Sequence, residues 1–268
     1  MAPWLTEELM SKKDLGQHFL VDHTICDRIV HFAGISSNDT VFEIGPGTGR
    51  LTDRLLNVAS QVIGIEVDQN LIPFLQNRWS GSLAKKFCVV QGDILKVHLK
   101  KILPHRGVHL IANLPYNIAT PIIKKMTESS DWFHSLTVMV QSEVASRILA
   151  PCNNRNYGYF SLFSQFHHQL EKGFQVPPEA FSPRPSVNST VIKMTPFSRN
   201  QHKASWNKLH PFLSCAFRHP RKTLLNNLRS LDITDKQLKK TMTACGIDRH
   251  QRPHQISLEE FCCLVQML

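Results

Sequence analysis

Apolar positions between residues 40 and 150 recur with two alternating periods. Short runs of β-branched and apolar residues predict strands, and the segments between them place leucines and isoleucines three or four residues apart, which predicts helices. Strand and helix therefore alternate, with short links, and this order favours a parallel, doubly wound α/β sheet with helices on both faces. The expected strands are 40–45, 61–68, 86–93, 108–116 and 135–141, and the expected helices are 50–60, 70–79, 120–128 and 142–150.

The pattern changes after residue 150. Residues 156–168 are rich in aromatic side chains, and residues 176–187 contain enough proline to predict extended or turned backbone. Residues 188–194 read as a late strand, and the polar stretch 196–205 is a plausible linker. We therefore expect a first domain over 1–196.

Helical signals dominate the last part of the chain. Thr234 with Gln237, and Ser257 with Glu260, form capping-box patterns ahead of helical segments, and Gly246 stands where a helix commonly ends. Residues 205–268 are therefore expected to form a small all-helical domain.

Basic residues are concentrated in this helical part. The whole chain has a net charge of +10, and residues 197–268 contribute +7 of it, from 12 basic and 5 acidic residues. An excess of this kind favours a polyanionic partner such as nucleic acid, while a basic, solvated surface is the alternative.

The seven cysteines include no C-x-x-C pair, and the fourteen histidines lack metal-ligand spacing. We expect free thiols that pack as small apolar side chains, no metal site, and for His167 and His168 a role in packing or on the surface. No apolar run is long enough to span a membrane, and the N-terminus lacks the apolar core of a secretory signal. These features favour a cytoplasmic protein that does not enter a membrane.

Glycines 45, 47 and 49 follow the first expected strand as G-x-G-x-G. Such a loop lets the backbone turn sharply and approach a ligand, although a tight β–α turn alone would also use it. Glu66 ends the next strand, where it can accept hydrogen bonds from ribose hydroxyls, and Asp93 ends the third, near the expected position of an adenine amino group. A dinucleotide fold prefers G-x-G-x-x-G, so this spacing favours S-adenosylmethionine as the cofactor.

The fourth strand ends in Asn113-Leu114-Pro115-Tyr116. Pro115 biases Leu114 to extended geometry. The side-chain oxygen of Asn113 and the backbone carbonyl of Leu114 can then each accept one N–H of an exocyclic amine, and Tyr116 offers a ring on which a base can stack. A strand-ending turn with a surface tyrosine is the alternative.

Seven motifs along nearly the whole chain resemble, in order, those of the small-subunit ribosomal RNA adenine dimethyltransferases, the kasugamycin-sensitivity methyltransferases. The resemblance implies a Rossmann-like class I methyltransferase sheet with a helical C-terminal domain. It also implies S-adenosylmethionine-dependent dimethylation at N6 of two adjacent adenosines near the 3′ end of small-subunit RNA. The motifs are LGQHFLVD (15–22), FEIGPGTGRLT (42–52), GDIL (92–95), NLPYNIATPII (113–123), MVQSEVASRI (139–148), VPPEAFSPRPSVNSTV (176–191) and PRKTLLNNL (220–228).

The resemblance also implies site residues. Phe181 matches an aromatic residue that stacks on the target base, although a buried loop anchor is an equal alternative for it. The substrate-handling residues implied are Asn113, Leu114, Tyr116 and Phe181. The cofactor-binding residues expected from the loop and the resemblance together are His18, Leu20, Gly45, Gly47, Glu66, Asp93 and Asn113.

RNA binding is expected to use Arg218, Arg221, Lys222 and Arg229, mainly as phosphate contacts, unless these lie on a merely solvated helix face. The implied partner is small-subunit RNA within the 30S particle or its precursor, and the implied state is a monomer acting in ribosome biogenesis. Rival interpretations are a non-catalytic assembly factor, a DNA adenine methylase, a nucleotide-dependent dehydrogenase and a methylase of large-subunit RNA.

Overall fold

The computed structural model describes residues 18–197, 201–202 and 204–268. Contacts divide the chain into two compact units, which are described separately. The first contains 18–145 and 171–196, and the second contains 146–170 and 197–268. Both boundaries between the units fall inside elements, namely α7 (Ser142–Ile148) and β7 (His168–Val176).

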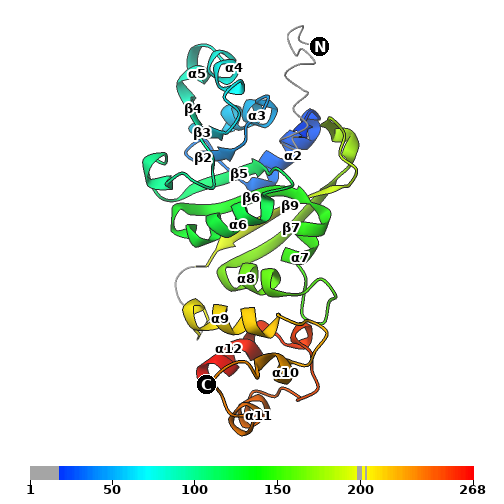
Figure 1. Ribbon diagram of the computed structural model, residues 1–268. Coiled ribbons are helices and arrows are strands. Elements are labelled where there is room, and N and C mark those ends of the chain that lie inside the picture. Colours follow the sequence, from blue (N-terminus) through cyan, green and yellow to red (C-terminus); the bar gives the residue numbers. More distant parts are fainter. Residues whose placement is uncertain (1–17, 198–200, 203) are drawn as a thin grey trace. The chain divides into compact units, whose positions relative to one another are not determined.

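A seven-stranded sheet organises the first unit, in the order β4-β3-β2-β5-β6-β9-β7 (Figure 1). The first five of these strands run parallel, and β9 pairs antiparallel with β6. The five strands expected within residues 40–150 are confirmed, as is the late strand, β9. The strands are β2 (Thr40–Ile44), β3 (Gln61–Glu66), β4 (Phe87–Gln91), β5 (Val108–Asn113), β6 (Phe133–Gln141) and β9 (Ser189–Pro196).

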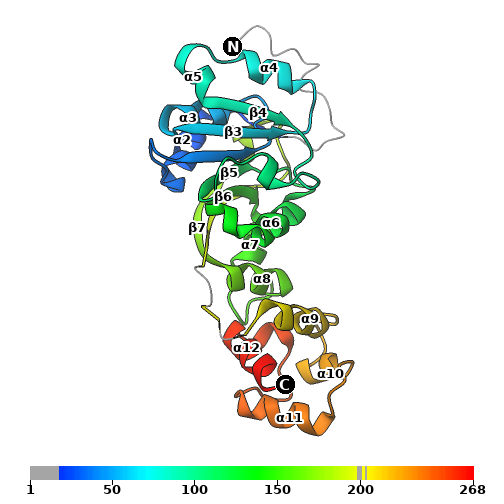
Figure 2. The ribbon, with the colours of Figure 1, turned by 90° about the vertical axis from the view of Figure 1, so that its left-hand side faces the viewer.

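Helices are present where the periodicity predicts them, in the regions 50–60, 70–79, 120–128 and 142–150, and two further helices, at 23–33 and 81–86, were not expected (Figure 2). Pro73 occupies the first turn of α4, where its missing N–H costs no intrahelical bond. One face of the sheet contributes Val41, Val62 and Ile111 to an apolar cluster with the buried sides of α2 and α3. The helices are α2 (His23–Ala33), α3 (Arg50–Val58), α4 (Leu71–Asn77), α5 (Gly81–Lys86) and α6 (Ala119–Glu128).

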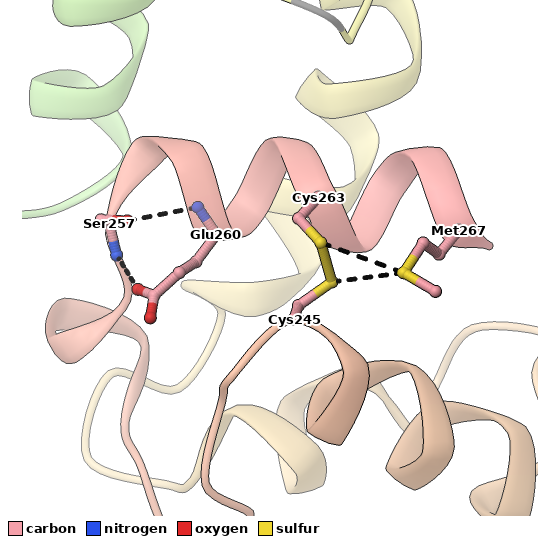
Figure 3. Close-up of a disulfide and its surroundings, with 5 residues drawn as sticks. All are labelled: Cys245, Ser257, Glu260, Cys263 and Met267. Carbon is pink, nitrogen blue, oxygen red and sulfur yellow. Dashed lines mark hydrogen bonds between the residues drawn. A yellow bond between two sulfur atoms is a disulfide. The ribbon is translucent and has the colours of Figure 1, made fainter.

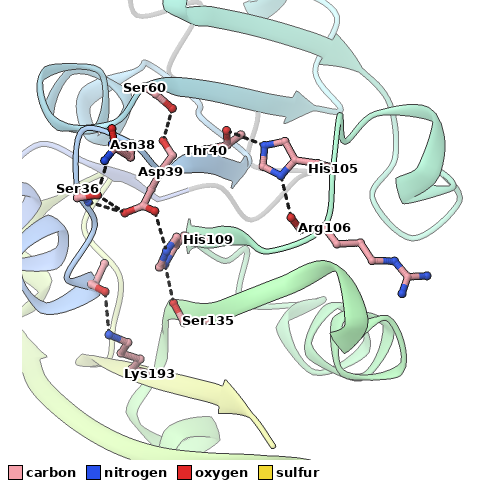
Figure 4. Close-up of polar contacts among 11 residues, drawn as sticks. Ser36, Asn38, Asp39, Thr40, Ser60, His105, Arg106, His109, Ser135 and Lys193 are labelled. Carbon is pink, nitrogen blue, oxygen red and sulfur yellow. Dashed lines mark hydrogen bonds and ion pairs between the residues drawn. The ribbon is translucent and has the colours of Figure 1, made fainter. Parts of the chain in front are cut away.

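A polar cluster joins the beginnings of β2, β5 and β6 at the edge of the sheet where these parallel strands start (Figure 4). Asp39 Oδ2 accepts hydrogen bonds from the backbone N–H and the hydroxyl of Ser36, at 2.7 and 2.8 Å. Its other oxygen lies 3.7 Å from Nε2 of His109, whose Nδ1 lies 2.9 Å from the Ser135 hydroxyl. Burial lowers the pKa of His109, and Asp39 opposes that shift. These contacts tie neighbouring strands together.

The second unit is helical. Its apolar cluster includes Leu162 of α8 together with Leu209, Leu224 and Phe261 from the C-terminal helices. The aromatic run 156–168 therefore packs with the C-terminal helices, and the compact units do not coincide with the expected division at residue 196. The helices are α8 (Tyr159–His167), α9 (Trp206–Ala216), α10 (Leu224–Leu228), α11 (Asp235–Ala244) and α12 (Leu258–Met267).

Helix ends in this unit follow the capping chemistry that the sequence predicts. The Ser257 hydroxyl accepts from the Glu260 backbone N–H at 3.2 Å, and the Glu260 carboxylate accepts from the Ser257 N–H at 2.7 Å (Figure 3). Thr234 accepts from the Gln237 N–H at 3.2 Å. Gly246 has a φ of 74°, the left-handed conformation expected just beyond a helix. The expected linker, 196–205, lies partly outside the described residues.

The expectation of free thiols is wrong for one pair of cysteines. Cys245, at the C-terminal end of α11, forms a disulfide with Cys263 of α12, with 5.9 Å between their Cα atoms (Figure 3). The two residues are 18 positions apart and meet only because α11 and α12 lie side by side. The free cysteines of the described part of the chain are Cys26, Cys88, Cys152, Cys215 and Cys262.

Two further observations concern the described residues alone. None of their helices is both long and apolar enough to cross a membrane. They also contain no group of three or more His, Cys, Asp or Glu side chains arranged to hold a metal ion.

Acidification is expected to destabilise the chain through two histidines of the second unit. Burial lowers the pKa of His167 to about 4 and that of His168 to about 3, from an ordinary value of 6.5. The unfolded chain therefore binds more protons than the folded chain as the pH falls below 6.5, so the free energy of unfolding decreases toward pH 4 and is regained above 6.5. Thermal unfolding midpoints measured from pH 8 to pH 5 test this.

The informative comparison is between two variants. His168→Phe removes a buried titrating ring and is expected to flatten the pH dependence of the midpoint, and His250→Phe, at an exposed position, serves as the control substitution. Equal slopes in the wild type and His168→Phe would contradict the assignment.

Candidate active site

A cavity of about 330 Å³ lies in the first unit at the carboxyl ends of β2, β3, β4 and β5. This is the edge of a parallel sheet where α/β folds bind their ligands. Segments far apart in the sequence meet there because parallel strands end on the same side. All of the expected cofactor-binding residues line this cavity, namely His18, Leu20, Gly45, Gly47, Glu66, Asp93 and Asn113.

The glycine loop forms the turn between β2 and α3. Gly47 has a φ of 57°, and a Cβ atom added to it would lie 2.9 Å from the ring of Phe19. Any other residue would therefore strain the backbone and press on that ring. The loop brings its backbone to the cavity because its central glycine has no side chain.

Glu66 ends β3 and is 2% exposed. Its Oε2 accepts a hydrogen bond from the Gly47 N–H at 3.1 Å, and its Oε1 accepts from the N–H groups of Val67 and Asp68 at 2.9 and 3.0 Å. Burial raises the pKa of Glu66, and these three N–H groups act against that shift. The contacts leave a further lone pair on Oε2, which can accept from a ribose hydroxyl.

Asp93 follows β4 and also lines the cavity. Its Oδ1 accepts from the Leu95 N–H at 2.9 Å, and Lys96 lies 3.5 Å from its Oδ2. The carboxylate thus shapes its own turn, and that turn places Ile94 and Leu95 on the cavity wall.

Several cavity residues were missed in the sequence. Val67 is 54% exposed although it is apolar, which suits the face of a flat heterocycle. Glu43 is buried and accepts a hydrogen bond from the Thr52 hydroxyl at 2.7 Å, and burial raises its pKa to about 8. The signal for Val67 was an apolar residue directly after a strand-end acid. The signal for Glu43 was a charged residue in the middle of an apolar strand, where its side chain has to be buried.

The tip of β5 carries an unpaired acceptor. Nδ2 of Asn113 donates to the His18 carbonyl at 3.1 Å, which fixes the orientation of the amide. Its Oδ1 is buried and has no hydrogen-bond partner within the part of the chain that the structure describes. An unsatisfied buried acceptor is costly, so its presence beside a cavity indicates a place where a ligand donates.

The next two residues complete this tip. Leu114 donates its N–H to the Met139 carbonyl at 3.1 Å, which keeps the backbone in line with β6, and Pro115 follows directly. The ring of Tyr116 lies 5.2 Å from that of His18, at 30°, and both rings line the cavity. Asn113, Leu114 and Tyr116 therefore gather at one place, as predicted.

Phe181 lies elsewhere. Its backbone pairs with Leu20, and its side chain is 4% exposed and packs in the apolar cluster of α2 and α3. It does not line the cavity. This packing agrees with the alternative of a buried loop anchor, because burying a phenylalanine side chain is favourable, and the base-stacking role stays a prediction.

The four predicted RNA-binding residues lie in the second unit, at or near the loop between α9 and α10. Asn227, which is 4% exposed, organises this loop: it accepts from the His219 N–H and donates to the His219 and Thr223 carbonyls, at 3.0 to 3.1 Å. The basic residues, all exposed, are Arg218, Arg221, Lys222 and Arg229, the last of which pairs with Asp235 at 3.1 Å.

The chain is similar to known proteins over nearly its whole length. The sequence model of the family described as ribosomal RNA adenine dimethylase matches residues 9–268. A protein of Clostridium botulinum, strain Loch Maree, named ribosomal RNA small subunit methyltransferase A, is 38% identical over 264 residues, which cover 96% of this chain and 95% of that protein. A protein of the same name from Clostridium acetobutylicum is 39% identical over 251 residues, which cover 93% and 90%.

Solved structures show a similar fold over nearly the whole chain. A dimethyladenosine transferase from Plasmodium falciparum has a TM-score of 0.76 and 26% identity, covering 92% of this chain and 96% of that one. The 23S rRNA methyltransferase ErmE has a TM-score of 0.74 and 21% identity, covering 93% and 99%. The second likeness concerns the fold alone.

Proposed function

Since this chain belongs to the ribosomal RNA adenine dimethylase family, we propose that it transfers methyl groups from S-adenosylmethionine to N6 of two adjacent adenosines near the 3′ end of small-subunit ribosomal RNA. Each adenosine receives two methyl groups. The substrate is the RNA within the small subunit or its precursor, and the reaction accompanies small-subunit biogenesis in the cytoplasm. The chain acts as a monomer.

The observation that carries this proposal is the buried Oδ1 of Asn113, a residue of the cavity wall, which has no hydrogen-bond partner among the described residues. An exocyclic amine brings two N–H donors. One can pair with this oxygen and the other with the Leu114 carbonyl, and Tyr116 provides a ring face beside them. The target adenine has to leave any base stack to reach this place.

Hydrogen bonds from both amino protons help the reaction itself. The lone pair of N6 is delocalised into the purine ring, which makes the amine a poor nucleophile. Two fixed acceptors favour a pyramidal nitrogen and stabilise the positive charge that develops on it. Because Asn113 Nδ2 is held by the His18 carbonyl, the acceptor is already oriented before the substrate arrives.

The lining of the cavity supports S-adenosylmethionine as the cofactor of this reaction. When bound, S-adenosylmethionine supplies an electrophilic methyl group on its sulfonium. In this proposal Glu66 holds the ribose, Val67 covers a face of the adenine, and the loop at Gly47 lets the ligand approach the backbone. Positioning the methyl group in line with N6 supplies much of the rate.

Relatives at 38% and 39% identity are named small-subunit methyltransferases, whereas the likeness to ErmE concerns the fold alone. These comparisons favour the small-subunit substrate over the large-subunit one. The first test is methyl transfer from labelled S-adenosylmethionine to small subunits that lack these methyl groups, followed by mapping of the modified bases. Label in dimethyladenosine near the 3′ end supports the proposal, and bound subunits without label would refute it.

Charge reversal in the basic loop of the second unit is expected to weaken RNA binding uniformly. Arg221→Glu with Lys222→Glu removes two proposed phosphate contacts, so the slope of log affinity against log salt concentration is expected to flatten by about 2. Titration of small-subunit RNA at several KCl concentrations measures both effects.

The matched control is another exposed, adjacent basic pair, Lys100 and Lys101 of the first unit. Lys100→Glu with Lys101→Glu changes the total charge equally, so it separates a local contact from a general charge effect. Equal losses in the two double variants would refute a local contact at the loop.

A further inference from the structure

Strand β9 also contacts the tip of β5, through Tyr116. The hydroxyl of Tyr116 lies 2.6 Å from the hydroxyl of Ser189, a distance at which either oxygen can donate. Ser189 is fully buried and is the first residue of β9, 73 positions along the chain from Tyr116. It pairs in register with Gln141, the last residue of β6.

This hydrogen bond restrains the ring of Tyr116 at its far end. Tyr116 follows Pro115 beyond the end of β5, so no strand pairing holds its backbone at this point. Its ring has two neighbours of known geometry, the tilted ring of His18 and the Ser189 hydroxyl. The phenolic oxygen lies on the axis about which the ring turns, so anchoring it to a buried strand fixes where the ring lies, and the neighbouring His18 ring limits rotation about that axis.

A tyrosine hydroxyl is protonated at neutral pH, and burial raises the pKa of Tyr116 further, so the group can donate to Ser189. Ser189 itself is anchored by the pairing of β9 with β6. The restraint therefore comes from the sheet, and its rigidity does not depend on the loop that carries Tyr116.

We propose that Ser189 is a positioning residue for methyl transfer, which holds the Tyr116 ring where the target base stacks and so brings N6 to Asn113 Oδ1 and the Leu114 carbonyl. This inference rests on the proposed function. Ser189 touches neither the cavity nor the reacting atoms, and it acts only through Tyr116.

The chain contains a matched control. Thr190, the next residue of β9, is also buried, and its hydroxyl lies 2.8 Å from that of Ser142. This neighbouring hydroxyl pair does not include Tyr116. Thr190→Val removes it with little change of shape, so this variant reports the general cost of losing a buried hydroxyl at the start of β9.

The experiment is a double-mutant cycle on methyl transfer to unmethylated small subunits. Ser189→Ala and Tyr116→Phe are each expected to lower kcat about 5- to 10-fold, the effect of losing one hydrogen bond. The double variant is expected to be no slower than Tyr116→Phe alone. Thr190→Val is expected to keep the wild-type kcat. Ser189→Thr, which retains a hydroxyl, is expected to keep most of the kcat that Ser189→Ala loses. The affinity for S-adenosylmethionine is expected to be the same in all of these variants.

A second readout reports stacking directly. RNA with 2-aminopurine at the target position lacks the 6-amino group and so reports stacking apart from the N6 hydrogen bonds. Its fluorescence is expected to fall when the base stacks on Tyr116, and to fall less with Ser189→Ala. If Ser189→Ala keeps the wild-type kcat and quenching, the proposed role of Ser189 is overturned while the proposed function stands. The same holds if the losses of Ser189→Ala and Tyr116→Phe multiply in the double variant, or if Thr190→Val loses as much kcat as Ser189→Ala. A wild-type chain that transfers no methyl group would instead overturn the proposed function.

Discussion

Asn113→Ala is expected to slow methyl transfer by about 100-fold or more, the usual cost of removing one fixed polar contact to a developing charge. The variant loses the buried Oδ1 that has no other hydrogen-bond partner within the described residues. It also loses the bond from Nδ2 to the His18 carbonyl, so the affinity for S-adenosylmethionine is expected to fall as well, by less than about 10-fold. Single-turnover methyl transfer and cofactor titration separate the two effects.

Asn117→Ala provides the matched control, because Asn117 lines the same cavity four residues away but is exposed. It is expected to keep most of the activity. Asn113→Asp retains an acceptor oxygen and is expected to fall between the wild type and Asn113→Ala. A wild-type rate in Asn113→Ala would refute the role of the strand tip.

Glu66→Ala is expected to weaken the binding of S-adenosylmethionine by about 100-fold or more, since each hydrogen bond between a ribose hydroxyl and a buried carboxylate contributes about 1.5 to 3 kcal/mol. The same carboxylate organises the loop by accepting from the N–H groups of Gly47, Val67 and Asp68. Calorimetric titration of the cofactor measures the loss.

Asp68→Ala is the control for this prediction. Asp68 lies two residues further along and uses its carboxylate within its own turn, where it accepts from Asn70 at 2.8 and 2.9 Å. It does not line the cavity, so its removal is expected to leave cofactor affinity within about 3-fold. Equal losses in Glu66→Ala and Asp68→Ala would point to loop collapse and against ribose recognition.

Local patterns in the sequence were sufficient for the parallel core of the first unit. A strand that is buried on both faces needs a continuous apolar run, and a helix between strands needs apolar residues three or four positions apart. Both patterns are visible in the sequence. The polar residues at the strand ends could then be placed together, because parallel strands that alternate with helices all end at one edge. This reasoning located Gly45, Glu66, Asp93 and Asn113 around one cavity.

Other features left no local pattern. β7 alternates buried and exposed residues only irregularly, and α8 is apolar enough to be read as either class of element. Because α8 packs with α9 and α12, residues 146–170 belong to the second unit. Whether Phe181 faced a ligand or the core depended on which helices covered it.

The sequence by itself therefore determined the parallel strands, the helices between most of them and the edge of the sheet at which the chemistry lies, because each follows from the periodicity of a short segment. Only the tertiary structure decided which distant residues meet. The pairing of Cys245 with Cys263, the burial of Phe181 and the contact of Ser189 with Tyr116 all join segments that are separate in sequence. Such contacts depend on how whole elements pack, and no single segment carries that information.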